Sequence, residues 1–338
     1  MPLAPPSLAI ESFAIDPETD ISRISLQRKF GNRLFLLRMI LNSSFSCGPL
    51  VWGCLVGLSI LPTSSAGVQS DAPQPVVEDT RYGLFNWLDH RSEYGQGAFP
   101  EPFVNDDSDG ETGEVRMDWF HTGIHSDHTD ELKVEYEGGF GVATFEAAAV
   151  YNWEESAGKT ERGFGSVEVA ARAPFFQYVS ADRMVDTTFG AGLEVAIPTN
   201  TMFSQSTEWV PKIFNDTRLG QHFTAQTIVG YSALFGGSDD GIHTLEYGTT
   251  LGYSIDRKDL AIPGIKRLIP IFEVAAETQL NKDDSGRTAV TGNAGFRANL
   301  DTICGVQPRL GIGYIFPINS TAREDLHWGV VTSFVFEF

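Results

Sequence analysis

The sequence predicts an all-β protein, a transmembrane antiparallel up-and-down β-barrel of about twelve strands. Most of the 338-residue chain consists of successive segments in which apolar and polar side chains alternate, which is the period of a strand. These segments run about 9–15 residues, the length that a tilted strand needs to cross a bilayer, whereas strands of soluble sheets average about 5–6 residues. The chain also ends on an alternating strand that has one aromatic face.

The predicted strands follow one another from residue 113 to the C-terminus, and turn residues separate them. In one of them, Lys133 and Glu135 alternate with Leu132 and Val134. The predicted strands span residues 113–125, 130–138, 142–153, 163–177, 186–198, 206–217, 221–235, 242–255, 268–280, 287–300, 307–317 and 326–338.

The last strand shows why lipid is the expected surroundings. Its aromatic face ends at Phe338, and the opposite face carries small residues and Glu337. Termini of soluble sheets fray, so exposed aromatics there are unusual, whereas a strand that closes a barrel in lipid places them against acyl chains and at the interface. The side chains expected at the membrane interface are Trp119, Trp153, Trp328, Phe334, Phe336 and Phe338.

In a lipid-facing barrel, the polar face of each strand must line the lumen. The expected lumen-lining side chains are Arg116, Asp118, Lys133, Glu135, Glu168, Arg172, Glu194, Glu246, Glu273, Glu277, Arg297 and Arg309. Both signs of charge are present, so pairing across strands is feasible. Carboxylates outnumber bases on the polar face, which favours cations and neutral solutes over anions.

Composition narrows the classes of protein further. The mean hydropathy of −0.11 argues against a helical membrane protein, whereas the alternating residues of a barrel cancel in such an average. A net charge of −20 repels nucleic acid, so we expect no nucleic-acid partner. Cys47 and Cys54 lie in a segment that we expect to be removed, which leaves Cys304 without a disulfide partner in the chain.

The front of the chain has the features of a secretory signal, predicted for residues 1–66. Basic residues between Arg28 and Arg38 precede an apolar stretch, and Ser64 and Ala66 form a small-x-small cleavage site. A membrane anchor is the alternative, although the apolar stretch is short for a span of roughly 20 residues. Met39 is an alternative start, with residues 1–38 an over-extended gene model. Residues 67–112 are expected to be irregular and to be able to enter the lumen as a plug.

The sequence contains only weak matches to metal-binding and catalytic motifs. The residues from Asn105 to Gly110 resemble half of a calcium loop, but Arg116 stands where the loop needs Glu, so a solvated linker is the preferred interpretation. His125 and His128 flank the first turn with His121, and they could hold a metal only if the turn brought two rings together. No Gly-x-Ser-x-Gly motif and no plausible Ser-His pair occurs. We therefore expect no catalytic residues, no cofactor, no metal and no enzyme activity.

Five segments occur in an order that resembles a known family. They are Gly163-Phe-Gly-Ser-Val-Glu-Val, Leu193-Glu-Val-Ala-Ile-Pro-Thr-Asn200, Ile269-Pro-Ile-Phe-Glu-Val-Ala-Ala-Glu-Thr-Gln-Leu280, Gly295-Phe-Arg and Arg309-Leu-Gly-Ile-Gly-Tyr-Ile-Phe-Pro317. Over roughly residues 113–338 the chain resembles outer-membrane barrels of the meta-pathway phenol-degradation (MetA-like) family. Asn200 stands where members often have Gly. The resemblance implies uptake of aromatic or other hydrophobic compounds, and it places Glu273, in the family's Pro-x-x-Glu strand, in the lumen.

These patterns lead to one functional expectation, a passive channel or transporter for small solutes in the outer membrane of a Gram-negative cell. Its expected partners are the lipid bilayer and, through the C-terminal strand, the barrel-assembly machinery. Two alternatives stay open. One is a non-conducting structural or docking barrel, whose lumen is filled by its own side chains. The other is a soluble secreted β-barrel binding protein.

Overall fold

The computed structural model describes residues 99–106, 113–140, 143–156, 158–182, 184–199 and 202–338. The predicted signal, the alternative start at Met39 and the position of Asn200 lie outside the described residues. The second part of the calcium-like stretch, from residue 107 onward, also lies outside them.

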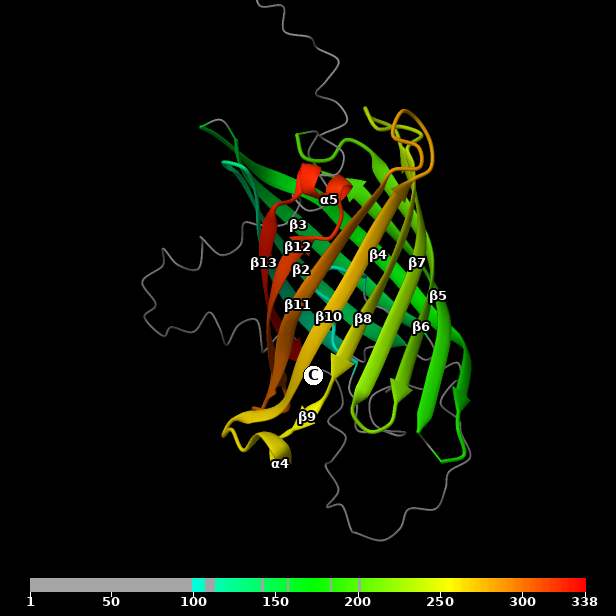
Figure 1. The fold of residues 1–338 in the computed structure, drawn as a ribbon, viewed down its shortest axis with the longest axis vertical. Coiled ribbons are helices and arrows are strands. Elements are labelled where there is room, and N and C mark those ends of the chain that lie inside the picture. The colour runs from blue at the N-terminus through cyan, green and yellow to red at the C-terminus, as the bar shows by residue number, and fades with distance from the viewer. Residues whose placement is uncertain (1–98, 107–112, 141–142, 157, 183, 200–201) are drawn as a thin grey trace, which may run out of the picture.

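Twelve long antiparallel strands form one closed barrel (Figure 1). Strands that follow one another along the chain pair with each other, and β13 pairs with β1 to close the ring. The strands are β1 (Gly113–Ile124), β2 (Asp127–Phe140), β3 (Ala143–Ser156), β4 (Lys159–Val179), β5 (Val185–Pro198), β6 (Thr207–Leu219), β7 (Phe223–Phe235), β8 (His243–Tyr253), β10 (Ile265–Gln279), β11 (Thr288–Leu300), β12 (Gln307–Pro317) and β13 (Trp328–Glu337). The predicted up-and-down barrel of about twelve strands is confirmed.

The main departures from the predicted strands lie near the turns. The link between β1 and β2 is tighter than expected, because His125 adopts a left-handed φ of 52° and β2 begins at Asp127. Strand β4 runs for 21 residues and exceeds its prediction at both ends. Two loops contain short elements that alternation does not reveal: β9 (Ile255–Asp256) with α4 (Arg257–Leu260), and α5 (Ser320–Asp325).

Helix α5 lies at one end of the barrel, opposite the end at which Gly113 and Phe338 meet (Figure 1). Asn319 caps the helix, since its side-chain oxygen accepts a hydrogen bond from the Ala322 N–H at 3.0 Å. We refer to these two ends as the α5 end and the terminal end. None of the helices in the described part of the chain is long and apolar enough to span a membrane.

The outer surface of the barrel is apolar and rich in aromatics. Phe334 and Phe336 on β13 and Phe338 directly after it are 45%, 38% and 49% exposed, whereas Val331 and Val335 on the other face of β13 are fully buried. Every other long strand carries at least one exposed large hydrophobic side chain, except β1. Water disfavours so much exposed apolar surface, and acyl chains accommodate it. The outer face therefore has the chemistry of a membrane-spanning barrel.

Candidate functional site

The predicted lumen residues lie on the strand face opposite the exposed aromatics. Lys133, Glu194, Glu246 and Glu277 are partly buried. The other eight are buried: Arg116, Asp118, Glu135, Glu168, Arg172, Glu273, Arg297 and Arg309. Of the predicted interface aromatics, the three phenylalanines are exposed, and Trp119, Trp153 and Trp328 are partly buried.

Many of the buried charges form ion pairs, both within β2 and between β2, β3 and β4. Lys133 Nζ lies 2.5 Å from Glu135 Oε2, 3.1 Å from Glu146 Oε1 and 3.3 Å from Glu168 Oε2. Arg172 pairs with Glu137 and also lies 3.4 Å from Glu146. Because an unpaired buried charge is costly, these pairs are what allows charged side chains to fill this part of the lumen.

The acidic side chains in this network form the one candidate metal grouping found among the described residues. One ligand atom each from Glu135, Glu137 and Glu146 lies within 4.8 Å of the others. Lys133 and Arg172 already contact these carboxylates, so the cations at this point belong to the protein itself.

The histidines near the first turn separate into different ring contacts. His121 stacks on His128 with ring centroids 5.6 Å apart, whereas His125 packs against His327 at 4.4 Å. Asp130 accepts hydrogen bonds from Trp119 Nε1 at 3.2 Å and from the His121 ring at 2.7 Å. The structure therefore does not bring His125 and His128 together as a ligand pair.

Residues 99–106 lie inside the barrel and contact the wall through their backbone. The N–H groups of Phe103 and Val104 donate to Glu273 Oε1 at 2.8 Å and Oε2 at 3.1 Å. Thr250 Oγ1 donates to the same carboxylate at 3.1 Å and Asn293 Nδ2 at 2.8 Å. Glu273, which is fully buried, thus accepts hydrogen bonds from four donors and joins the inserted segment to β8, β10 and β11.

Arginine side chains donate hydrogen bonds to backbone carbonyl oxygens of the same segment. Arg297 Nε donates to the carbonyl oxygen of Glu101 at 2.6 Å, and Arg297 Nη2 donates to that of Pro102 at 3.3 Å. Arg116 also donates to the Pro102 carbonyl. The Glu101 side chain is fully buried and pairs with Arg309.

Apolar side chains surround Phe103 within the lumen. They form one buried cluster, which consists of Phe103, Phe120, Ile269, Ile271, Ile315, Leu326 and Val331. The Arg297 guanidinium lies over the Phe103 ring at 4.4 Å from its centroid. The prediction of a polar lumen missed this cluster. Its signal was available in Ile269 and Ile271, because β10 is apolar on both faces at that point.

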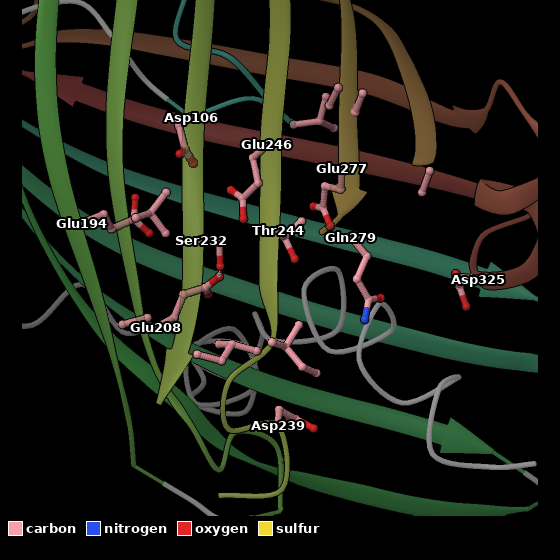
Figure 2. A pocket seen from close by; sticks show the side chains of 18 of the residues that line it. Asp106, Glu194, Glu208, Ser232, Asp239, Thr244, Glu246, Glu277, Gln279 and Asp325 are labelled. Atoms are coloured by element: carbon pink, nitrogen blue, oxygen red, sulfur yellow. Dashed lines mark hydrogen bonds between the residues drawn. The ribbon is translucent and has the colours of Figure 1, made fainter. Parts of the chain in front are cut away.

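Beyond the inserted segment, toward the α5 end, lies a cavity of about 280 Å³. Figure 2 shows Glu194, Glu246 and Glu277 among the side chains around it. Eleven acidic side chains line the cavity against one basic side chain, Arg287. The acidic residues are Asp106, Glu131, Glu168, Glu194, Glu208, Asp239, Glu246, Glu277, Asp284, Glu324 and Asp325.

In the described part of the chain, three cations contact carboxylates that line the cavity, and carboxylates hold all of them: Lys133, which lies 3.3 Å from Glu168, Arg287 and Lys212. Arg287 lies 2.8 Å from Asp284 and 2.5 Å from Glu324, and hydrogen bonds to these carboxylates raise the pKa of its guanidinium. Lys212 Nζ lies 2.9 Å from Glu194 Oε2 and 3.1 Å from Asp106 Oδ2. The surplus of carboxylates makes the cavity an environment that attracts cations.

Comparison with known proteins yields structural likeness only. No protein-family model matches the chain, and no curated protein matches it. The COG4313 outer membrane channel from Pseudomonas putida F1 is 13% identical over 71% of this chain and 100% of that chain, with a TM-score of 0.48. The NanC porin is 12% identical over 67% of this chain and 99% of its own, with a TM-score of 0.42. LpxR from Salmonella typhimurium is 11% identical over 67% of this chain and 100% of its own, with a TM-score of 0.40. These likenesses are too distant to assign a function, so the resemblance to the MetA-like family stays a prediction.

Proposed function

We propose that this chain is an outer-membrane channel that admits small cationic or neutral solutes from the α5 end, with residues 99–106 as a plug. The observation that carries the proposal is the cavity between that segment and α5, with its eleven carboxylates and one guanidinium. Rings of carboxylates in a pore favour cations, because the local potential raises cation concentration and repels anions.

The solute class follows from the whole lining of the cavity. Apolar side chains, including Phe203, Ile228 and Leu234, line it together with the carboxylates. A pocket that combines apolar walls with a few charged groups suits solutes that carry an apolar part. This lining supports the aromatic or hydrophobic solutes that the resemblance to the MetA-like family implies.

The aromatic outer surface supports residence in the outer membrane of a Gram-negative cell. The register between β13 and β1 runs from Gly123 opposite Trp328 to Glu114 opposite Glu337, so the C-terminal strand completes the ring. This closing role supports recognition of that strand by the barrel-assembly machinery. The proposal includes a cleaved signal over residues 1–66 and a barrel over residues 113–338, with no catalytic step.

A planar bilayer tests the channel directly. The protein spanning residues 67–338 is refolded, inserted and studied under a KCl gradient, in which the sign of the reversal potential reports the favoured ion. The expected current is cation-selective, and neutralising Glu194, Glu246 and Glu277 together to Gln reduces that selectivity.

A matched control removes three exposed carboxylates outside the cavity, through Glu161→Gln, Asp182→Asn and Asp259→Asn, and is expected to keep the parent selectivity. A current that favours anions, or a selectivity that the cavity variant leaves unchanged, would refute the assignment of the acidic cavity as the solute path.

The second candidate is the non-conducting structural or docking barrel. It is favoured by the ion pairs around Lys133 and Arg172 and by the inserted segment, because both fill the lumen. This candidate predicts no current even when the segment is released. The soluble-barrel alternative needs an apolar interior, whereas this interior contains Glu273 and Arg297, both fully buried, and the exterior is aromatic.

A further inference from the structure

We propose that the inner wall of the barrel is a peptide-binding site for a short acidic–proline–aromatic sequence, and that residues 99–106 are its tethered occupant. The contacts that hold this segment would also hold the same sequence supplied as a separate peptide. The inference goes beyond solute passage, because it assigns the wall a ligand of its own.

The first support is that the wall forms hydrogen bonds with both the N–H groups and the carbonyl oxygens of the segment's backbone. Glu273 accepts the N–H groups of Phe103 and Val104, and Arg297 donates to the carbonyl oxygens of Glu101 and Pro102. Backbone contacts of this kind supply affinity in peptide recognition, and side-chain pockets supply specificity. Pro100 and Pro102 also restrict the peptide before it binds, which lowers the entropy cost.

The second support is that the wall surrounds the side chains of both Glu101 and Phe103. The Glu101 carboxylate lies among Arg297, at 3.4 Å, and Arg309. The ring of Phe103 is 2% exposed and packs in the apolar cluster beneath the Arg297 guanidinium. An acid two residues before an aromatic side chain is therefore what the wall selects.

The third support is that the wall is recessed where the segment lies. A Cβ on Gly311 would lie 2.8 Å from the Phe103 ring, and one on Gly248 would overlap the side-chain oxygen of Asn105. Removal of the segment would take two of the four donors from Glu273 and would take the Glu101 contacts from Arg297 and Arg309, which are all buried. The emptied wall is thus expected to bind a replacement peptide.

The test replaces residues 99–106 by a glycine-serine linker of equal length and adds a fluorescent peptide of sequence Phe-Pro-Glu-Pro-Phe-Val-Asn-Asp. Fluorescence anisotropy in detergent micelles measures binding, and heat-dependent gel mobility confirms that the barrel is folded. The expected result is saturable binding that a scrambled peptide of the same composition does not show.

Two substitutions in the linker protein, the variant in which the glycine-serine linker replaces residues 99–106, distinguish binding at this site from nonspecific binding of the peptide to the barrel. Glu273→Gln is expected to weaken peptide binding at least about tenfold, because a charge-assisted acceptor for two N–H groups is lost. Glu277→Gln removes a carboxylate from the same strand and face, at a position that lines the cavity and does not contact the segment, and is expected to leave peptide affinity unchanged.

A second variant keeps the proposal testable if the linker protein does not fold. Phe103→Ala in the full chain weakens the tethered segment, so the added peptide is expected to bind this variant and not the parent, in which the tethered copy competes at high effective concentration. Peptide binding no stronger than that of the scrambled sequence, or binding that Glu273→Gln leaves unchanged, overturns the proposal. A barrel that binds the peptide and passes no ions contradicts the channel alone, and a cation channel that ignores the peptide contradicts this inference alone.

Discussion

Replacing Glu273 by Gln tests how firmly the inserted segment is held. The carboxylate accepts the Phe103 N–H at 2.8 Å and the Val104 N–H at 3.1 Å, and both distances lie in the normal range for N–H···O hydrogen bonds. A glutamine keeps one oxygen acceptor and presents an NH₂ group to the other N–H. One backbone N–H of the segment then loses its partner, as does the wall donor that shares the same oxygen, and the remaining bond from the segment loses its charge assistance.

The magnitude follows from these two changes. A buried donor without a partner costs about 1–3 kcal/mol, and the difference between a charged and a neutral acceptor is about 1 kcal/mol. The segment is therefore held less tightly by about 2–4 kcal/mol, which raises the released population about 30-fold to several-hundred-fold. Glu277→Gln makes the same type of substitution on the same face of β10, and it is expected to have no such effect.

Thiol labelling measures the released population. Cys304 is exposed and is replaced by Ser, and Pro102→Cys supplies a reporter at a buried position whose carbonyl contacts are kept. When release is fast relative to labelling, the rate of reaction with a membrane-impermeant maleimide follows the released population. Equal labelling rates in the Glu273→Gln and parent proteins would show that this carboxylate does not hold the segment.

Three further predictions concern the wall and the outer surface. Gly311→Val places a side chain against the Phe103 ring, so labelling at position 102 is expected to accelerate, and an unchanged rate would contradict the recessed wall. Lys212→Met leaves Asp106 and Glu194 without their shared cation and is expected to lower the free energy of unfolding by about 3–5 kcal/mol in a urea titration; a loss below about 1 kcal/mol would show that the ion pairs contribute little. Phe296→Arg, within β11, is expected to destabilise the barrel in vesicles by about 2–4 kcal/mol and Phe338→Arg by about 0–1 kcal/mol, and equal effects would contradict a lipid-facing band.

The strands were predictable because alternation sets both their length and their faces. On β13, the exposed phenylalanines and buried Val331 and Val335 follow directly from a period of two. The inward orientation of Glu273 follows from the same rule, since Phe272 on the opposite face is exposed.

The partners of the lumen residues were not predictable, because periodicity assigns a face and says nothing of what fills the lumen. Glu273 accepts a hydrogen bond from Phe103, 170 positions away, in a segment without any periodic pattern. The inward-facing Ile269 and Ile271 had no evident role until the Phe103 ring was placed against them. Helix α5 depends on a local cap at Asn319, which alternation does not reveal.

The central claim is that solutes enter through an acidic lumen cavity. The reversal potential of the refolded protein across a planar bilayer under a KCl gradient tests it most directly. The account predicts a cation-selective current whose selectivity falls when Glu194, Glu246 and Glu277 are neutralised, and a larger current in the Glu273→Gln variant. An anion-selective current, or no current in either the parent or the Glu273→Gln protein, would contradict it.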